Sequence, residues 1–228
     1  MSRMTYKTEI VDGRCYFNDG RKHVLVDTGY GRTVSIDGTI GDYKVSLCDK
    51  EDLQSFNPTI MNNGEKIGGI LCPMNGYNAF ITDKYVTIDN EYSEIPKCEW
   101  FIPFDNPFAP IVRCKVDGID KALFFDSGMR LPALDDDNLI VGKNVLGKQL
   151  EWIGIMEGLF ETPFYNATFT FPCGYTMNSK MEHDFLHKYV SRFRHFGVEG
   201  FLGLQFLEQF DVKILTVGKK AGIALVSK

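Results

Sequence analysis

Two acidic tripeptides stand at equivalent places in the sequence, Asp27-Thr28-Gly29 and Asp126-Ser127-Gly128. Each directly follows three apolar residues. An apolar strand that ends in aspartate buries the base of that side chain. The hydroxyl residue can donate a hydrogen bond inside the turn, and glycine allows close approach of the backbone. One such tripeptide is ordinary turn chemistry, whereas two copies in matching settings indicate a common purpose.

Two carboxylates brought within a few ångströms of each other have a specific chemical use. They cannot both ionise comfortably, so they share a proton and their pKa values separate. The ionised carboxylate can take a proton from a bridging water, which attacks a peptide carbonyl, while the protonated carboxyl stabilises the carbonyl oxygen. Because such a pair titrates as a unit, the acid and the base are not assigned from the sequence.

An internal repeat contains both tripeptides. Residues 14–29 align without gaps on residues 113–128, with Arg, Cys, Lys, Asp and Gly identical at equivalent positions. A later pair, Gly69-Ile70-Leu71-Cys72 and Gly200-Phe201-Leu202-Gly203, lies 131 positions apart instead of 99. The difference between these offsets means that the second copy carries about 32 additional residues between its two landmarks. We expect a short helix and then a strand after each landmark, the strands being 85–88 and 210–214.

A proline-rich stretch separates the two copies. Four of the nine prolines lie in residues 95–110, which excludes a regular helix or a central strand there. We interpret this stretch as a linker with a boundary near residue 104. The predicted domains are therefore residues 1–104, which carry Asp27, and residues 105–228, which carry Asp126.

The two Asp motifs, with their preceding apolar triplets, resemble the active-site motifs of the pepsin/retropepsin superfamily of aspartic peptidases. Residues 200–207, Gly-Phe-Leu-Gly-Leu-Gln-Phe-Leu, resemble the later landmark and short helix that each lobe of this superfamily carries. The layout is similar to a single-chain fused pair with lobes of retropepsin size. The resemblance implies a mostly β fold: two similar β-barrel-like lobes related by pseudo-two-fold symmetry, with a few short helices.

The resemblance also implies roles for individual residues. Asp27 and Asp126 correspond to the catalytic pair of an aspartic endopeptidase. Thr28 and Ser127 correspond to the hydroxyl residues that brace the two loops against each other, and Gly29 and Gly128 to the glycines of the tight turns. No cofactor or metal is implied.

Members of the superfamily close β-hairpins, called flaps, over an extended peptide. Candidate flaps here are the hairpin around residues 35–40, with Ile36 and Gly38, and the segment 152–160, with Trp152, Ile153 and Gly154. An ordinary hairpin that faces the core is the alternative for the segment 152–160.

Three features depart from the superfamily's pattern. Tyr30 and Met129 follow the motif glycines, where a small residue is common, and Cys72 stands where the second copy has a glycine. Arg130 follows the second motif, and an arginine directed at the two aspartates would keep both ionised; we expect Arg130 to point to solvent instead. These departures motivate a second hypothesis, a catalytically inactive protein of the same fold that binds peptides or a partner.

The segment 181–196 predicts an amphipathic helix with an aromatic stripe at residues 185, 189, 193 and 196. His183 and His187 are spaced to share one helix face, so a zinc hydrolase is a third hypothesis. The local pattern lacks a third ligand and a catalytic glutamate, and a solvated helix face is the favoured interpretation. Residues 135–137, three aspartates without calcium-loop spacing, predict a solvated turn.

Composition limits the remaining possibilities. The net charge of -5 gives no indication of binding to nucleic acid or to an anionic membrane. No apolar run is long enough for a signal-peptide core or a membrane span, so we expect an intracellular chain whose six cysteines are reduced. Three disulfides in a chain that has lost a leader is the alternative. We expect a monomer, an internal pseudo-dimer, whose partner is a peptide or protein substrate.

Overall fold

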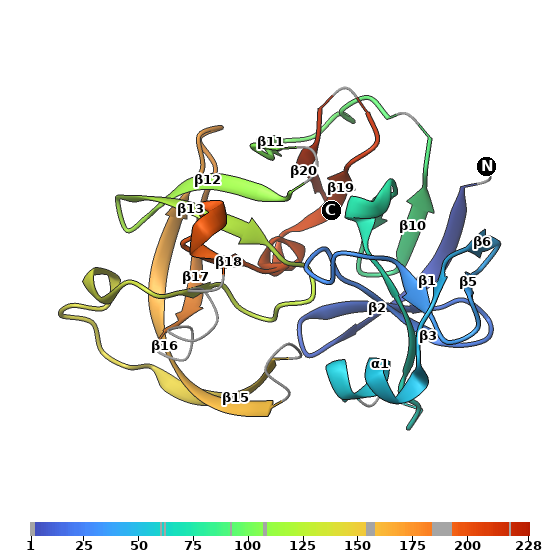
Figure 1. Cartoon of the computed structure of the whole chain (residues 1–228). Helices are drawn as coiled ribbons and strands as arrows, with labels where there is room; N and C mark the ends of the chain where they lie inside the picture. The colour runs from blue at the N-terminus through green and yellow to red at the C-terminus, as the bar shows by residue number, and fades with distance from the viewer. Residues whose placement is uncertain are drawn as a thin grey trace.

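The computed structural model describes residues 3–59, 61, 63–91, 93–106, 109–153, 158–183, 193–218 and 220–228, and its architecture is mostly β (Figure 1). The strands are β1 (Met4–Val11), β2 (Arg14–Asn18), β3 (His23–Val26), β4 (Val34–Ser35), β5 (Thr39–Ile40), β6 (Tyr43–Lys44), β7 (Ser46–Leu47), β8 (Ile67–Leu71), β9 (Asn78–Ile81), β10 (Tyr85–Asp89), β11 (Trp100–Pro103), β12 (Ile111–Val116), β13 (Ile119–Phe125), β14 (Ala133–Leu134), β15 (Gly147–Ile153), β16 (Gly158–Thr170), β17 (Thr176–Glu182), β18 (Gly200–Leu202), β19 (Phe210–Leu215) and β20 (Gly222–Ser227). The helices are α1 (Lys50–Phe56) and the short 3-10 turns η1 (Pro73–Asn75), η2 (Asp137–Leu139), η6 (Arg194–Phe196) and η7 (Gln205–Glu208).

The sequence repeat is also a repeat of strand pairing. Strand β3 pairs in parallel with β8, with Leu25 opposite Ile70, and β13 pairs in parallel with β18, with Phe124 opposite Phe201. The antiparallel neighbours β4 and β14 pair with β8 and β18 in the same equivalent registers. Residues that are equivalent in the sequence repeat therefore also have equivalent strand partners in the structure. Each Asp motif follows a strand with the same neighbours.

One sheet joins the two halves. Strand β9 pairs antiparallel with β19, with Ile81 opposite Val212, so the sheet runs β11-β20-β19-β9-β10-β1 before continuing through the rest of the first half. Strand β11 belongs to the predicted first domain, yet it pairs with β20 near the end of the chain. The boundary near residue 104 stays a prediction.

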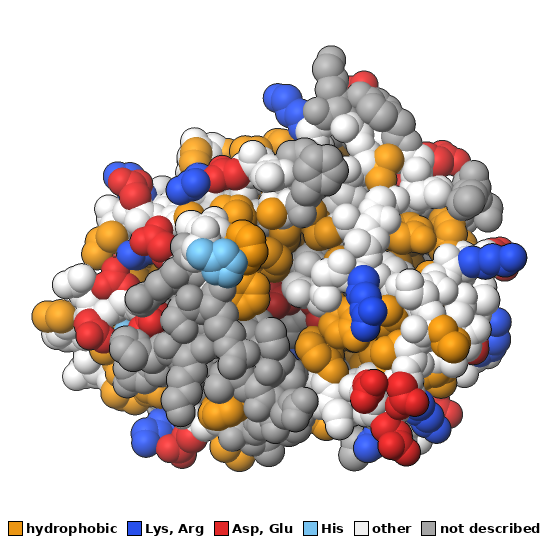
Figure 2. Space-filling view, in the orientation of Figure 1, with side chains coloured by type: hydrophobic (Ala, Val, Ile, Leu, Met, Phe, Trp, Pro, Cys, Tyr) orange, Lys and Arg blue, Asp and Glu red, His pale blue; other side chains and the backbone are white. Residues whose placement is uncertain are grey.

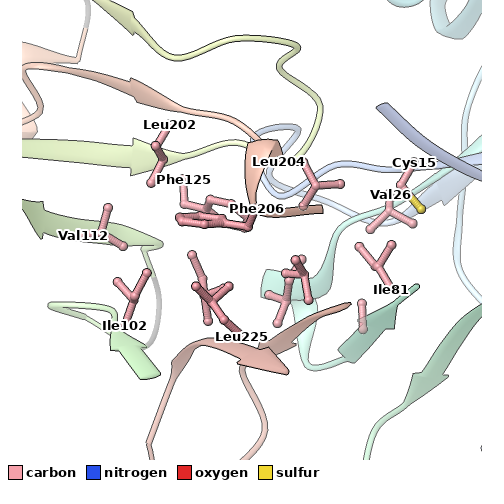
Figure 3. Packing of buried hydrophobic residues seen from close by; sticks show 14 of the residues in the cluster. Cys15, Val26, Ile81, Ile102, Val112, Phe125, Leu202, Leu204, Phe206 and Leu225 are labelled. Atoms are coloured by element: carbon pink, nitrogen blue, oxygen red, sulfur yellow. The ribbon is translucent and has the colours of Figure 1, made fainter. Parts of the chain in front are cut away.

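A shared hydrophobic cluster fixes the two Asp-bearing strands relative to each other. Figure 3 shows Val26, which precedes Asp27, and Phe125, which precedes Asp126, in the same cluster as Phe206 and Leu225. All four side chains are at most 1% exposed. Because a close-packed interior resists displacement, the strand ends cannot move apart without opening this core.

Several local expectations are confirmed and one differs. The turns η1 and η7 follow the landmark strands β8 and β18, and β10 and β19 cover the strands expected at 85–88 and 210–214. The helix expected over 181–196 is wrong at its start, because Met181 and Glu182 end strand β17. Residues 184–192, which hold most of its predicted stripe, lie outside the described residues, and residues 194–196 form the 3-10 turn η6.

Two buried lysines make equivalent ion pairs in the two halves. Lys22 Nζ lies 2.8 Å from Asp37, and Lys121 Nζ lies 2.6 Å from Asp136. Both lysines and both aspartates are 99 positions apart, so the repeat extends eight residues beyond the motif glycines. The solvated turn predicted at 135–137 is therefore wrong for Asp136, whose carboxylate neutralises a buried charge.

None of the six cysteines, all of which the structure describes, forms a disulfide. Among the described residues, no helix has the length and apolar character needed to cross a membrane.

Two equivalent glycines allow the crossing of β4 over β8 and of β14 over β18, but they have different amounts of space. A Cβ at Gly200 would lie 2.7 Å from the carbonyl oxygen of Ala133, whereas a Cβ at Gly69 would lie 3.3 Å from that of Val34. Gly200→Ala should therefore destabilise the fold by about 1–3 kcal/mol through overpacking, and Gly69→Ala by clearly less. Urea unfolding of the two variants checks this, and equal losses would contradict it.

Candidate active site

The structure brings Asp27 and Asp126 together. Their carboxyl groups are joined by a side-chain hydrogen bond, which requires one proton between them. Both side chains are buried, with relative exposures of 4% and 8%. In the space-filling view, acidic side chains lie deep in the hollow between the two halves, with hydrophobic side chains on either side (Figure 2).

Backbone groups hold each aspartate in the same way. The amide of Asp27 donates to the carbonyl of Leu71 at 2.9 Å, and the amide of Asp126 donates to that of Leu202 at 2.8 Å. Each residue thus extends the parallel pairing of its strand by one bond. The tight turn then returns the amide of Gly29 to Asp27 Oδ1 at 2.7 Å and that of Gly128 to Asp126 Oδ1 at 2.9 Å.

The hydroxyl residues brace the two loops against each other. Thr28 Oγ1 donates to the carbonyl of Phe125 and accepts from the amide of Ser127, at 2.7 and 2.9 Å. Ser127 Oγ donates to the carbonyl of Val26 and accepts from the amide of Thr28, at 2.9 and 3.0 Å. These four buried bonds form a closed reciprocal set. They fix the separation of the loops that carry the carboxyl groups.

The motif glycines have a packing reason as well as a conformational one. A side chain on Gly29 would collide with the carboxyl group of Asp126, and one on Gly128 with that of Asp27. Each glycine thus lies against the carboxyl group of the opposite half. Any larger residue at either place would separate the pair.

Burial raises the pKa of both aspartates, because a low-dielectric site disfavours the charged carboxylate. The pKa of Asp126 is raised further by the negative charge of Asp27 beside it. Asp27 Oδ1 also accepts a second amide bond, from Tyr30 at 3.0 Å, which favours its charged form. The pair therefore retains one proton well above the pH at which an exposed aspartate ionises.

Arg14 is a site residue that sequence reasoning placed only in the repeat. Its Nε donates to the carbonyl of Gly128 at 2.7 Å, and its Nη1 contacts Asp12 at 3.2 Å. The Arg14 guanidinium works against the rise in the pKa of both aspartates, but burial outweighs it. The equivalent Arg113 instead pairs with exposed Asp105 at 2.5 Å, so the repeat could have flagged Arg14 without revealing this crossing contact.

Arg130 is directed neither at the two aspartates nor freely into solvent. Its Nη1 lies 2.7 Å from Asp12, and its Nη2 donates to Gln149 Oε1 at 2.8 Å. Its side chain is 31% exposed. The expectation that Arg130 points to solvent is therefore wrong in part, because the ion pair with Asp12 holds it between the two halves.

The other departures from the superfamily's pattern are accommodated locally. Tyr30 packs edge-on against Phe56 of α1, with ring centroids 4.7 Å apart, and Met129 packs beside Phe201. Cys72 is buried with its Sγ 3.8 Å from the carbonyl of Thr28. Tyr30 and Met129 each stand three positions beyond an aspartate of the pair, and both are partly exposed.

The two hairpins proposed as flaps differ greatly in size. In the first half, Gly38 accepts a bond from Val45 ahead of the short β5–β6 pair, and Ile36 packs on the apolar cluster of its own half. In the second half, β15 and β16 form a long antiparallel hairpin that contains Trp152 and Ile153. Gly154 lies outside the described residues. Contact of either hairpin with a substrate stays a prediction.

The zinc hypothesis gains no geometry from the described residues. His183 is buried, with Nε2 3.5 Å from Asp137, and His187 lies outside the described part of the chain. Within the described ranges, no group of three or more His, Cys, Asp or Glu side chains could hold a metal ion.

Comparison with known proteins gives a likeness of fold only. No protein-family model matches the sequence, and no curated protein matches it. A solved structure, the aspartic proteinase from Irpex lacteus, aligns with 99% of this chain and 98% of its own, with a TM-score of 0.53 and 12% identity. The chain therefore has an aspartic-protease-like fold. At this identity the likeness carries no information about activity.

The reciprocal bonds between the loops predict that replacing the hydroxyl of Thr28 by a methyl group will strongly reduce the stability of the fold. Thr28→Val keeps the shape of the side chain but leaves the buried amide of Ser127 and the carbonyl of Phe125 without these partners. We expect a loss of about 2–6 kcal/mol of unfolding free energy, at about 1–3 kcal/mol for each of the two buried groups. Chemical denaturation measures it, with Thr168→Val, which removes an exposed bond to Asn178, as the matched control. Equal losses in the two variants would show that the brace is not needed for the fold.

The raised pKa of Asp126 predicts how stability varies with pH. As pH rises from the unfolded pKa to the higher folded pKa, the unfolded chain loses its proton first, so wild-type stability falls. Asp126→Asn has no such proton, and its stability relative to wild type should increase between pH 4 and pH 8.

Asp37→Asn provides a control with the opposite sign. The ion pair with Lys22 lowers the pKa of Asp37, so this carboxylate stabilises the fold above its unfolded pKa and ceases to do so in acid. The variant should be least stable relative to wild type near neutral pH. Urea midpoints at several pH values measure both trends, and parallel trends would disprove the assignment for Asp126.

Proposed function

We propose that this protein is an aspartic endopeptidase that hydrolyses peptide bonds with a water held between Asp27 and Asp126. The observation that carries the proposal is the buried, hydrogen-bonded pair of carboxyl groups. The aspartic-protease-like fold is consistent with this activity. The reciprocal hydroxyl bonds support it further, since they hold both carboxyl groups at a fixed separation.

The asymmetry of the pair suggests which residue holds the proton. Asp27 accepts two amide bonds and Asp126 one, and the pKa of Asp126 is raised by burial and by the charge of Asp27. In the resting enzyme the shared proton then resides chiefly on Asp126.

Hydrolysis follows from this starting state. Asp27 removes a proton from the water, whose oxygen bonds to the carbonyl carbon, and Asp126 gives its proton to the carbonyl oxygen. When the tetrahedral intermediate collapses, the carbon–nitrogen bond breaks. The amine nitrogen receives the proton from Asp27, and the hydroxyl proton returns to Asp126, so the pair is regenerated.

The proposed enzyme is a fused pair of short lobes, residues 1–104 and 105–228, that works as a monomer without a metal or cofactor. Its substrate is an extended peptide or protein segment that lies across both motif loops. The paired strands and the shared ion-pair pattern of the two halves support this arrangement.

A second candidate function is binding without cleavage by the same fold. It is motivated by Tyr30 and Met129, which are bulky and partly exposed next to the aspartates. Binding of a peptide with no turnover at any pH from 3 to 8 would favour it over hydrolysis.

The catalytic assignment predicts the effect of removing either carboxylate. Asp27→Asn and Asp126→Asn should each lower kcat by at least about 10²–10⁴-fold, because the remaining carboxyl group cannot both activate water and polarise the carbonyl. Digestion of a peptide library by the wild type and both variants measures this, with circular dichroism to establish that the variants are folded.

Asp105→Asn is a suitable control because Asp105 is exposed, pairs with Arg113 and lies in neither candidate flap. It should keep wild-type cleavage under conditions where it is folded. Full activity in either dyad variant would refute the assignment. Inhibition by a statine-type transition-state mimic would exclude the binding-only alternative.

A further inference from the structure

In both halves, a side-chain amide donates a hydrogen bond to a backbone carbonyl just beyond the Asp motif. The carbonyl of Gly31 accepts a bond from the Asn75 amide at 3.2 Å, and the carbonyl of Arg130 accepts one from the Gln205 amide at 2.5 Å. Residues 31 and 130 are equivalent in the repeat, and both amides come from the short turns after the landmark strands. The first half has no side chain at this position, and the second half has an arginine.

The same half also carries a long hairpin where the first half has only short strands among the described residues. Between β4 and β8, the first half has β5, β6 and β7, each of two residues, and helix α1. Between β14 and β18, the second half has β15, of 7 residues, and β16, of 13. Strand β15 is at the edge of its sheet, where β16 alone pairs with it. One edge of β15 has no strand partner among the described strands of this sheet, so contacts other than strand pairing must hold that edge.

Arg130 provides that contact. One side of its guanidinium donates to Gln149 in β15, and the other side pairs with Asp12 in the turn between β1 and β2 of the first half. Gln149 in turn donates to the buried carboxylate of Glu182 at the end of β17. The β15 strand is therefore tied to its own half and, through Arg130, to the opposite half.

Asp12 lies in a tight turn and contacts two arginines. Asp12 and Gly13 have φ values of 52° and 74°, typical of the tight turn that joins two antiparallel strands. Asp12 presents one carboxylate oxygen to Arg130 and the other to Arg14, which donates to the carbonyl of Gly128 in the second catalytic loop. The turn, the loop and the hairpin thus meet in one charged network.

The ion pair between Asp12 and Arg130 is too exposed to contribute much to global stability. Asp12 is 49% exposed and Arg130 31%, and ion pairs at such sites contribute only about 0–1 kcal/mol to stability. Global stability is thus a poor explanation for it. The planar guanidinium instead holds two partners at fixed angles, which lysine cannot do.

We propose that Arg130 is a positioning residue that ties strand β15 to the first half, beside the loop that carries Asp126. Arg130 is four positions beyond Asp126, and strand β15 continues from Gln149 for four more residues, about 13 Å at the usual rise. In Figure 1 this strand runs toward the first half. The effect expected on peptide binding rests on the proposed function, and the tie itself does not.

Hydrogen exchange on the full chain tests the connection without requiring activity. In Arg130→Met, the amides of 147–153 and 158–164 should exchange about tenfold faster than in wild type, because the tie of Gln149 to the first half through Arg130 is lost. Arg113→Met is the matched control, since Arg113 pairs with exposed Asp105 and not with Gln149 or Asp12. It should leave exchange in the hairpin unchanged.

Two further variants make the test specific to the network. Gln149→Met should increase exchange at least as much, because it also removes the bond to Glu182. Adding Arg130→Met to it should have no further effect, because the connection through Arg130 is already broken. Arg130→Lys, which can keep the charge pair with Asp12 but not both partners, should also increase exchange. Unchanged exchange in Arg130→Met, or additive effects in the double variant, would overturn the proposal.

Kinetics then separate this proposal from the proposed function. If the chain cleaves peptides, Arg130→Met should raise KM several-fold and leave the pH profile of kcat unchanged, since the dyad is untouched. A raised KM with a shifted pH profile would show that Arg130 acts on the dyad instead, and would overturn the proposal. A wild-type chain without any cleavage would count against the endopeptidase function, while the exchange result would still decide the role of Arg130.

Discussion

The separation of two buried carboxyl groups is the constraint on which the rest of this structure depends. Asp27 and Asp126 come from opposite halves, and their mutual hydrogen bond requires the strand ends to meet within a narrow tolerance. Two devices provide it. The hydroxyls of Thr28 and Ser127 make four hydrogen bonds between the two catalytic loops, two to each other's amides and two to carbonyls of the opposite strand. Farther back, Val26 and Phe125 are packed in one hydrophobic cluster.

This constraint has an energetic cost that the fold has to offset. Bringing two acidic groups out of water raises the pKa of both, so the site opposes ionisation above the acidic range. The shared sheet through β9 and β19 and the reciprocal hydroxyl bonds resist the resulting tendency of the halves to separate. Strain of this kind at one place, supported by ordinary packing elsewhere, is typical of sites that perform chemistry.

The two halves share one frame but differ in particular contacts. Strand registers, the Lys22 and Lys121 ion pairs and the amide bonds after each landmark obey the repeat. The differences reach the catalytic loops themselves, because Arg14 bonds to Gly128 of the opposite half whereas Arg113 pairs with Asp105 of its own. The repeat therefore sets the frame of the site, and the contacts between the halves make it asymmetric.

The sequence alone determined the local chemistry and the repeat. Asp27 and Asp126, their hydroxyl and glycine neighbours, and the landmark strands could all be recognised because strand periodicity and turn chemistry are local. The equivalent pairs of lysine and aspartate were also present at the offset of 99 and could have been found. The start of the helix predicted at 181–196 was wrong because Met181 and Glu182 pair in β17 with β16, and such pairing overrides local periodicity.

Only the tertiary structure decided what crosses between the halves. No spacing in the chain reveals that Arg14 bonds to Gly128, or that Asp12 holds Arg130 away from the dyad and beside Gln149. The contacts of Arg14 with Gly128 and of Asp12 with Arg130 join residues more than 100 positions apart, and their geometry depends on how the two halves pack. The sequence therefore specified which groups could react, and the packing of one half on the other determined their distance, their shared proton and their surroundings.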